Sequence, residues 1–281
     1  MRAEQCTDPI AYHGEGPVWS TTWGGLRWVD MLAGDILSLT DDGQVKRRHV
    51  ANIAAALRPR VGGGAVIGIE RGFLLEDAHS VASEKIQVWD DESIRMNDGG
   101  CDPDGRFYCG SMGYDQQPGV ASLYRLDPDL SVHPVLGDVT ISNGLEWSPD
   151  GTLAYFVDTY THRIDVFDYD TETGLTNRRA LVVLTEDELP DGLTVDEANG
   201  IWVAINGSGQ VRRYTPQGHL DEVIEVDARQ VTACTFGGPN LQQLYITTSR
   251  ENLAEDDDPL AGSLFVADTQ ISGMPVREFA G

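Results

Sequence analysis

Residues 143–158 read NGLEWSPDGTLAYFVD, and a further run of alternating apolar residues follows at 162–170. A polar residue opens this stretch, and a short apolar run, a Ser-Pro-Asp-Gly turn and a second apolar run come after it. Short runs rich in Val, Tyr, Phe and Trp that are separated by Pro, Asp and Gly are typical of antiparallel strands joined by tight turns. The stretch therefore predicts two paired strands followed by a third.

The same order of polar residue, strand, turn and strand recurs along the chain. Counting the copies gives about six units of ~40–50 residues, and each unit is long enough for four antiparallel strands. We therefore predict an all-β fold, a six-bladed β-propeller with four-stranded antiparallel blades, in a single domain over residues 1–281. Five units open at Glu15, Asn97, Asn143, Asp191 and Thr232, and a weaker copy lies between Val61 and Trp89.

Helical spacing is nearly absent from the sequence. Residues 51–57, ANIAAAL, are the best candidate for a helix, and this candidate is short. We expect at most this one helix beside the strands.

The charge of the chain limits its partners. The 281 residues include 20 Lys and Arg against 45 Asp and Glu, which gives a formal net charge of −25. Such a surface repels phosphate backbones, so we expect no nucleic-acid partner and no anionic membrane partner. Residues 1–9, MRAEQCTDP, lack the apolar core of a signal peptide, and no apolar run is long enough to span a membrane. We expect a cytoplasmic protein that is a monomer or a weak homodimer.

The four cysteines, Cys6, Cys101, Cys109 and Cys234, form no Cys-x-x-Cys pair. This scatter favours reduced, mostly buried thiols, as in a reducing cytosol. A disulfide between Cys101 and Cys109 is the less favoured alternative.

The polar residues that open the units hold the functional signal. Equivalent positions of a propeller are related by its pseudo-rotation axis, so their side chains approach one central region from different blades. Glu15, Asn143 and Asp191 would then supply a ring of oxygen atoms, which suits a hard divalent cation.

A structural interpretation of these residues stands beside this one. Asn-Gly and Asp-Gly are the commonest hairpin turns, and residues 42–43, 104–105 and 150–151 fit that role. However, Asn143 and Asp191 lie about one short strand ahead of the turn in their unit, and Glu is not a turn former. The coincidence across units favours the metal site.

Seven motifs, in order over nearly the whole chain, resemble those of the senescence marker protein, gluconolactonase and regucalcin family. The motifs are GEGPVW (14–19), RMNDG (95–99), DPDGRF (102–107), ISNGL (141–145), FDYD (167–170), LPDG (189–192) and CTFGG (234–238). The resemblance implies a six-bladed propeller with a central divalent metal, and its Glu, Asn and Asp ligands map onto Glu15, Asn143 and Asp191.

The resemblance also implies hydrolysis of a sugar lactone, with Arg95 and Asn97 on the substrate side of the metal. The stretch after Met112, GYDQQ (113–117), departs from the pattern and is shorter than in the animal members of the family. Asp115 in this stretch is our candidate for a further substrate contact.

Hydrolysis of a lactone requires a polarised carbonyl and a deprotonated water, and a cation with open coordination positions serves both needs. We expect Asp191 to be the catalytic proton acceptor as well as a ligand. Oxygen ligands favour Ca²⁺ as the one divalent ion, while Zn²⁺, Mn²⁺, Mg²⁺ and Fe²⁺ also accept such sites.

The alternative function is a non-enzymatic propeller that binds calcium or a protein partner. Arg95 and Asn97 favour the lactonase, because an ion-binding scaffold has no need of them. His13, beside Glu15, is expected to be a structural neighbour of the site rather than a ligand. The acidic run of Glu251 and residues 255–258 is expected to be a solvated surface.

Overall fold

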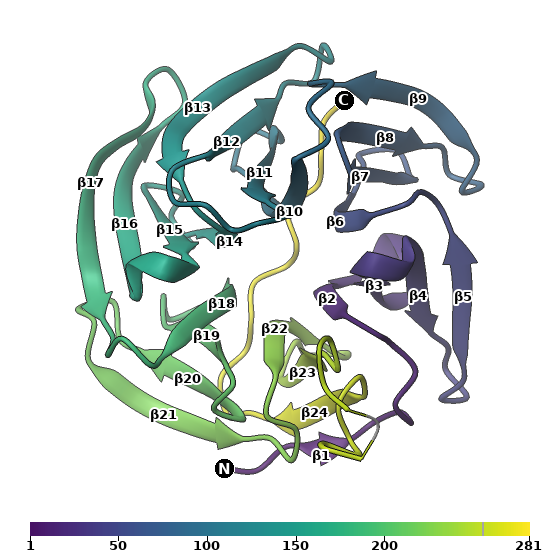
Figure 1. Ribbon diagram of the computed structural model, residues 1–281, viewed down its shortest axis with the longest axis vertical. Helices are drawn as coiled ribbons and strands as arrows, with labels where there is room; N and C mark the ends of the chain where they lie inside the picture. Colours follow the sequence, from purple (N-terminus) through teal and green to yellow (C-terminus); the bar gives the residue numbers. More distant parts are fainter. Residues whose placement is uncertain (255) are drawn as a thin grey trace.

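The computed structural model describes residues 1–254 and 256–281. Six four-stranded antiparallel sheets surround a central axis, as Figure 1 shows, so the predicted all-β six-bladed propeller is confirmed. The helical elements of the described chain are the short 3₁₀ turns η1 (Thr21–Trp23), η2 (Met31–Ala33) and η3 (Thr159–Thr161). Within the described residues, no helix has the length and apolar character needed to cross a membrane.

Each blade runs from an innermost strand at the axis to an outermost strand at the rim. The innermost strands of blades 1 to 6 are β2 (Gly14–Ser20), β6 (Ala54–Pro59), β10 (Ile94–Cys101), β14 (Ser142–Trp147), β18 (Leu189–Val195) and β22 (Val231–Gly237). The second strands are β3 (Gly25–Asp30), β7 (Ala65–Ile69), β11 (Phe107–Gly113), β15 (Leu153–Asp158), β19 (Ile201–Asn206) and β23 (Gln243–Thr248). The third strands are β4 (Asp35–Leu39), β8 (Gly72–Glu76), β12 (Ala121–Leu126), β16 (Arg163–Asp170), β20 (Gln210–Tyr214) and β24 (Leu264–Asp268). The outermost strands are β5 (Val45–His49), β9 (Ala82–Gln87), β13 (Val132–Val139), β17 (Gly174–Val183), β21 (Leu220–Glu225) and β1 (Glu4–Gln5).

Blade 6 is built from both ends of the chain. β1 pairs with β24 in antiparallel register, with Glu4 opposite Val266 and Gln5 opposite Phe265. The first strand therefore completes the last sheet and closes the ring.

The apolar side chains are buried between neighbouring blades. One cluster joins Met31 and Ile36 of the blade 1 region to Leu57 of β6 and Phe107 of β11, and similar clusters fill the other blade interfaces. The sheets pack face to face, and their contacts hold the innermost strands in position around the axis.

The predicted helix over residues 51–57 is wrong. Residues 54–59 form β6, which pairs with β7, and Ala54, Ala55, Ala56 and Leu57 are all buried there. Tertiary packing overrides the helix propensity of alanine, because small residues let the innermost strand pack closely on both neighbours. Blade 2 consequently begins at Ala54, earlier than the weak copy predicted from Val61.

All four cysteines are free, as the favoured prediction states, and the alternative disulfide between Cys101 and Cys109 is absent. Cys101, Cys109 and Cys234 are buried, and Cys6 is half-buried. Burial raises the pKa of each of the three buried thiols, so they are unreactive packing groups.

A C-terminal segment, residues 269–281, leaves blade 6 and crosses the ring, as the yellow trace in Figure 1 shows. Along its path it hydrogen-bonds or forms β-bridges with every blade. Its partners are Gln242 and Leu241 of blade 6, Asp196 and Glu197 of blade 5, Trp147 and Ser148 of blade 4, Gly105 of blade 3, Pro59 and Val61 of blade 2 and Thr22 of blade 1. We call residues 269–281 the crossing segment.

Candidate functional site

The predicted polar residues lie at irregular points of the innermost strands. Every innermost strand shows a shift in its pairing with the second strand: β2 after Glu15, β6 around Ala55, β10 at residues 97–98, β14 at residues 143–144, β18 at residues 191–192 and β22 around Thr232. A β-bulge of this kind re-aims a side chain. The repeat therefore turns one side chain per blade toward the axis, and the sixth position is occupied by Ala55.

The glycines after Asn143 and Asp191 have a different role from turn glycines. A Cβ on Gly144 would lie 2.5 Å from the Leu193 nitrogen, and one on Gly192 would lie 2.4 Å from the Ala233 Cβ. Both dipeptides lie inside innermost strands, where glycine permits close approach of the next blade. By contrast, Gly43, Gly105 and Gly151 have positive φ angles of 79°, 74° and 72° in turns. The turn interpretation thus holds for those three glycines and not for Gly144 or Gly192.

Carboxylates at the ends of second strands hold the segments that lead into the site. Asp158 accepts hydrogen bonds from the amides of Thr140 (3.0 Å) and Ile141 (2.9 Å), just before Asn143. Asp30 accepts equivalent bonds from the amides of Tyr12 (3.1 Å) and His13 (3.0 Å), just before Glu15. The repeat supplies the same support to two of the predicted ligands.

A cavity of about 390 Å³ opens where the innermost strands begin. Five of the six predicted site residues line it, and all five are buried: Glu15, Arg95, Asn97, Asn143 and Asp191. Other polar lining residues include His13, Tyr114, Gln116, Thr159, Tyr160, Asn206, Gln230, Ser249, Glu251 and Asn252. The cavity combines fixed charges with amide and hydroxyl groups.

Asp115 is not among the residues that line the cavity. Its side chain is exposed, and its Oδ1 accepts a hydrogen bond from the Gln117 amide at 3.3 Å. Its neighbours Tyr114 and Gln116 line the cavity instead. A substrate contact by Asp115 stays a prediction.

Arg95, Asn97 and Asn143 form a chain of hydrogen bonds across blades 3 and 4. The Arg95 guanidinium donates to Asn97 Oδ1 at 2.7 Å, and Asn97 Nδ2 donates to Asn143 Oδ1 at 3.0 Å. Asn143 Nδ2 donates to Thr159 Oγ1 at 2.7 Å, so hydrogen bonds at both its nitrogen and its oxygen fix the orientation of the Asn143 amide. Burial lowers the pKa of Arg95, but an arginine remains a cation at neutral pH.

The two central carboxylates are buried, and their surroundings disfavour charge in the metal-free protein. Burial raises the pKa of Asp191 to about 8. The hydrogen bond that Asn206 Nδ2 donates to Asp191 Oδ2 at 3.0 Å lowers this pKa, but its effect is smaller than that of burial. Burial and the nearby Asp191 and Asp98 carboxyls raise the pKa of Glu15 well above its usual range. A positive charge at the centre would relieve both penalties.

The donor set fits a divalent cation. Asp191 Oδ1 is buried and has no hydrogen-bond partner, which is costly unless a ligand satisfies it. Together with a Glu15 carboxylate and the Asn143 amide oxygen, it offers the hard oxygen donors that Ca²⁺ accepts. Among the described residues, no group of three His, Cys, Asp or Glu side chains gathers with metal-ligand spacing, so the candidate site depends on the amide as its third member.

His13 and Glu251 border the carboxylates. His13 Nδ1 lies 2.8 Å from Ser249 Oγ and 3.3 Å from Glu251 Oε2, and His13 Nε2 lies 4.0 Å from Glu15 Oε1. Burial, with the charge of Arg95, lowers the pKa of His13 to about 3, so the ring is neutral. The solvated surface predicted for the acidic run is wrong for Glu251, which is half-buried at the cavity, and for Asp258, whose side chain accepts a hydrogen bond from the Arg229 amide at 2.8 Å and is largely buried. Asp256 and Asp257 are exposed as predicted, and Glu255 lies outside the described residues.

The buried Asp191 predicts an unusual pH dependence of stability. The Asp191 carboxyl loses its proton near pH 3.8 in the unfolded chain and near pH 8 in the folded protein. Between these two pH values the metal-free native state therefore binds more protons than the unfolded state. Its contribution is fully present below pH 3.8 and is lost as the pH rises through 8, with a slope of up to about 1.4 kcal/mol per pH unit. We expect the unfolding free energy of the metal-free protein to fall relative to that of Asp191→Asn from pH 5 to pH 8, measured by urea denaturation in chelator. A difference that does not change with pH would contradict a buried, neutral Asp191.

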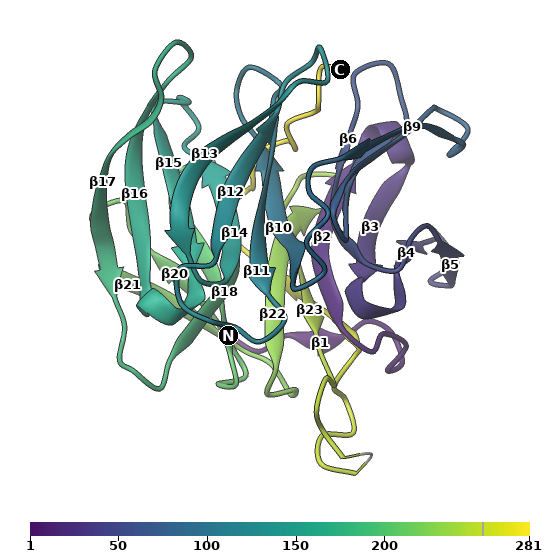
Figure 2. The ribbon, with the colours of Figure 1, turned by 45° about the horizontal axis from the view of Figure 1, so that its top comes forward.

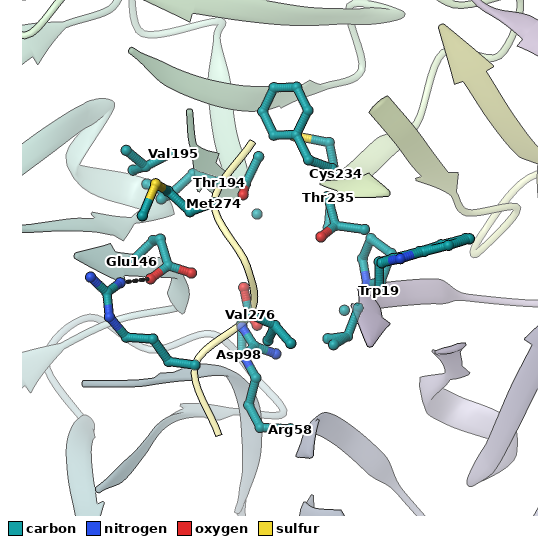
Figure 3. A pocket seen from close by; sticks show the side chains of 18 of the residues that line it. Trp19, Arg58, Asp98, Glu146, Thr194, Val195, Cys234, Thr235, Met274 and Val276 are labelled. Atoms are coloured by element: carbon teal, nitrogen blue, oxygen red, sulfur yellow. Dashed lines mark hydrogen bonds and ion pairs between the residues drawn. The ribbon is translucent and has the colours of Figure 1, made fainter. Parts of the chain in front are cut away.

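The crossing segment covers the end of the propeller axis that lies opposite the cavity of about 390 Å³. Met274, Pro275, Val276 and Arg277 of the crossing segment line a cavity of about 40 Å³ together with later residues of the innermost strands. Figure 3 shows Met274 and Val276 at this cavity. Arg277 forms an ion pair of 3.0 Å with Glu146, and the buried Asp98 lies in the same cavity near Arg58. This volume holds at most a few water molecules. Figure 2 shows the C-terminus at the other end of the ring from β1.

The SMP-30/Gluconolactonase/LRE-like region, a family defined by its sequence profile, matches residues 13–250. The chain belongs to this family. The matched residues include every predicted site residue, and the enzyme class predicted from the sequence, a carboxylic ester hydrolase of the gluconolactonase type, agrees with the family.

Relatives of the chain span nearly its whole length. A Bacillus subtilis (strain 168) protein, YvrE, whose name proposes a sugar lactone lactonase, is 35% identical over 98% of this chain and 97% of its own length. Regucalcin of Oryctolagus cuniculus is 34% identical over 99% of this chain and 98% of its own length. The crystal structure of a calcium-binding protein, regucalcin from Agrobacterium tumefaciens strain C58, superposes with a TM-score of 0.92 at 27% identity and covers 99% of this chain and 97% of that one.

Three residues that line the cavity, Asn206, Thr159 and Ser249, were not predicted from the sequence, and they occupy equivalent positions in their blades. Asn206 ends β19, and Thr159 and Ser249 follow directly after β15 and β23. Because the second strand runs antiparallel to the innermost strand, its end lies beside the start of the innermost strand. An alignment of the repeats at the ends of second strands would have found all three.

Proposed function

We propose that this protein hydrolyses a sugar (aldono)lactone, such as gluconolactone, to the free sugar acid in a metal-dependent reaction. The observation that carries the proposal is the buried Asp191, whose Oδ1 has no partner, in the same cavity as the hydrogen-bonded Arg95 and Asn97. The lactonase name of the Bacillus subtilis relative supports the reaction, and the calcium-binding relative supports the metal.

Glu15, Asn143 and Asp191 would hold the cation, with Ca²⁺ favoured because all three donors are oxygens. A bound divalent cation supplies Lewis-acid polarisation of the lactone carbonyl and eases deprotonation of water. Asn206 fixes one oxygen of the Asp191 carboxyl and leaves the other free to act.

Asp191 is the proposed general base. Its ionised carboxylate accepts a proton from water while the water oxygen forms a bond to the carbonyl carbon of the lactone. The tetrahedral intermediate then collapses, the bond from the carbonyl carbon to the ring oxygen breaks, and that oxygen takes up a proton to become a hydroxyl group. The product is an open-chain hydroxy acid, which releases a proton to solvent at neutral pH.

Arg95 and Asn97 bind the substrate in this proposal. The guanidinium is a fixed cation that donates to the lactone or to the carboxylate product, and its bond to Asn97 keeps both groups in place. The amides of the cavity both donate to and accept from sugar hydroxyls. A cavity with so many polar groups suits a polyhydroxylated lactone better than an alkyl lactone.

The test is acid release from a panel of aldonolactones, measured with a pH indicator after subtraction of spontaneous hydrolysis. Protein stripped with chelator should be inactive, and Ca²⁺, Mn²⁺, Zn²⁺ or Mg²⁺ should restore turnover. If metal binds but no lactone is hydrolysed with any of these ions, the non-enzymatic calcium-binding alternative is favoured and the lactonase proposal fails.

A further inference from the structure

The cavity has an inner half and an outer half of different character. The inner half is made of the buried residues Glu15, Arg95, Asn97, Asn143 and Asp191. The outer half includes two large aromatic side chains: Tyr114 is 47% exposed and Tyr160 is 45% exposed. The reaction proposed above uses only the inner half.

Both tyrosines are held in place by their hydroxyl groups. The Tyr114 hydroxyl donates to Glu70 Oε1 of blade 2 at 2.9 Å, and the Arg95 guanidinium lies 6.0 Å from the centre of the Tyr114 ring. The Tyr160 hydroxyl donates to Gln116 Oε1 at 2.7 Å, which joins blade 4 to the loop after β11. Rings that are fixed before a ligand arrives lose little conformational entropy on binding.

The cavity is also larger than one sugar requires. Its volume of about 390 Å³ lies within the range of ~300–1,000 Å³ found for pockets that enclose drug-sized ligands, and a monosaccharide lactone is smaller than such ligands. When the carbonyl lies at the buried carboxylates, space remains toward Tyr114 and Tyr160.

The geometry of a six-membered lactone determines what would fill this space. The fourth carbon lies across the ring from the carbonyl carbon, so a carbonyl held in the inner half leaves the oxygen on the fourth carbon facing outward. A second sugar linked through that oxygen would lie in the outer half. Its apolar C–H face suits contact with an aromatic ring, and its hydroxyls suit the Gln116 amide, which is bonded to Tyr160.

We propose that the outer half, formed by Tyr114, Tyr160 and Gln116, is a second sugar subsite, and that lactones of 1,4-linked disaccharides are preferred substrates. This inference rests on the lactonase function proposed above. It assigns Tyr160 a specificity role, since the inner half alone accounts for the reaction.

The turnover test compares cellobiono-1,5-lactone with glucono-1,5-lactone. Wild-type protein should show a kcat/KM for the disaccharide lactone at least as high as for the monosaccharide lactone. Tyr160→Ala should lower the ratio of the two kcat/KM values about five-fold, mainly through the KM of the disaccharide lactone. Tyr160→Phe, which keeps the ring and loses the bond to Gln116, should keep most of the ratio.

Tyr12→Ala is the matched control, because Tyr12 is 42% exposed but does not line the cavity. It should leave the ratio at the wild-type value. A wild-type protein that hydrolyses the disaccharide lactone ten-fold more slowly than the monosaccharide lactone would overturn the subsite while leaving the lactonase proposal intact. An equal loss on both substrates in Tyr160→Ala would do the same.

A binding measurement tests the subsite without turnover. By calorimetry in the presence of Ca²⁺, cellobionate should bind wild-type protein about five-fold or more tightly than gluconate, and Tyr160→Ala should remove most of this difference. Equal affinities in the wild type overturn the subsite. Tighter binding of cellobionate without hydrolysis of either lactone supports the subsite and refutes the lactonase function.

Discussion

Asp191→Asn is expected to lower kcat/KM for the best aldonolactone by about 10²–10⁴-fold and to abolish stoichiometric Ca²⁺ binding. The asparagine keeps the size of the side chain but removes the proton acceptor and one of two proposed carboxylate ligands. It also removes a buried ionisable group, so the metal-free variant should be at least as stable as wild type at pH 8. Activity, calcium titration calorimetry and thermal unfolding of the same preparation check the three effects.

Glu84→Gln is the control for the change in charge. Glu84 lies exposed on the outermost strand β9, so this substitution alters the net charge by the same amount away from the cavity. It should leave turnover and calcium affinity at wild-type values. An Asp191→Asn protein that binds Ca²⁺ with unchanged affinity would refute the ligand assignment, and one that retains full turnover would refute the assignment of the base.

Phe279→Ala is expected to lower the unfolding free energy by about 3–5 kcal/mol. The Phe279 ring is fully buried in the cluster that contains Leu57 of β6 and Phe107 of β11. Its amide donates to the Pro59 carbonyl at 2.8 Å, and its carbonyl accepts from the Val61 amide at 2.9 Å. These two bonds hold the backbone in place, so the space left by the removed ring cannot collapse. Urea denaturation at constant Ca²⁺ measures the change.

The neighbouring Glu278→Ala serves as the comparison for Phe279→Ala. Glu278 Oε1 accepts one exposed hydrogen bond from Thr22 Oγ1 at 2.9 Å, and its loss should cost less than about 1 kcal/mol. Similar losses for both variants would show that the crossing segment contributes no specific packing at Phe279.

The propeller was predictable because each repeat is specified by residues that are close together in the sequence. Turn glycines such as Gly105 and Gly151 alternate with apolar runs, and both requirements act within a few residues. Blade 2 was harder, since Ala54–Pro59 has the composition of a helix and takes its strand form from the neighbouring sheets. Such a tertiary effect leaves little trace in a short stretch of sequence.

Some residues of the candidate site were likewise predictable from the repeat, and others depend on tertiary structure. Glu15, Asn143 and Asp191 open their units, so the repeat alone brings them to the axis. The partners Thr159 and Asn206 lie at the ends of second strands, and their relevance follows only when the antiparallel register is known. Glu251 belongs to an acidic run, and the composition of such a run predicts a solvated surface. Its position beside His13 depends on the conformation of a loop, which no local sequence pattern specifies.

The crossing segment bears on how the protein is made. Together its residues contact all six blades, and β24 also pairs with β1, which lies more than 250 residues earlier in the sequence. These contacts can form only after every blade strand that precedes the crossing segment has been synthesised, and such distant pairings are slow to form. A chain that terminates a dozen residues early would keep every blade strand and the family motifs, yet it would lack Arg277 and Phe279. Loss of these contacts should thus make a protein that lacks residues 270–281 easier for proteases to cleave than one that contains them.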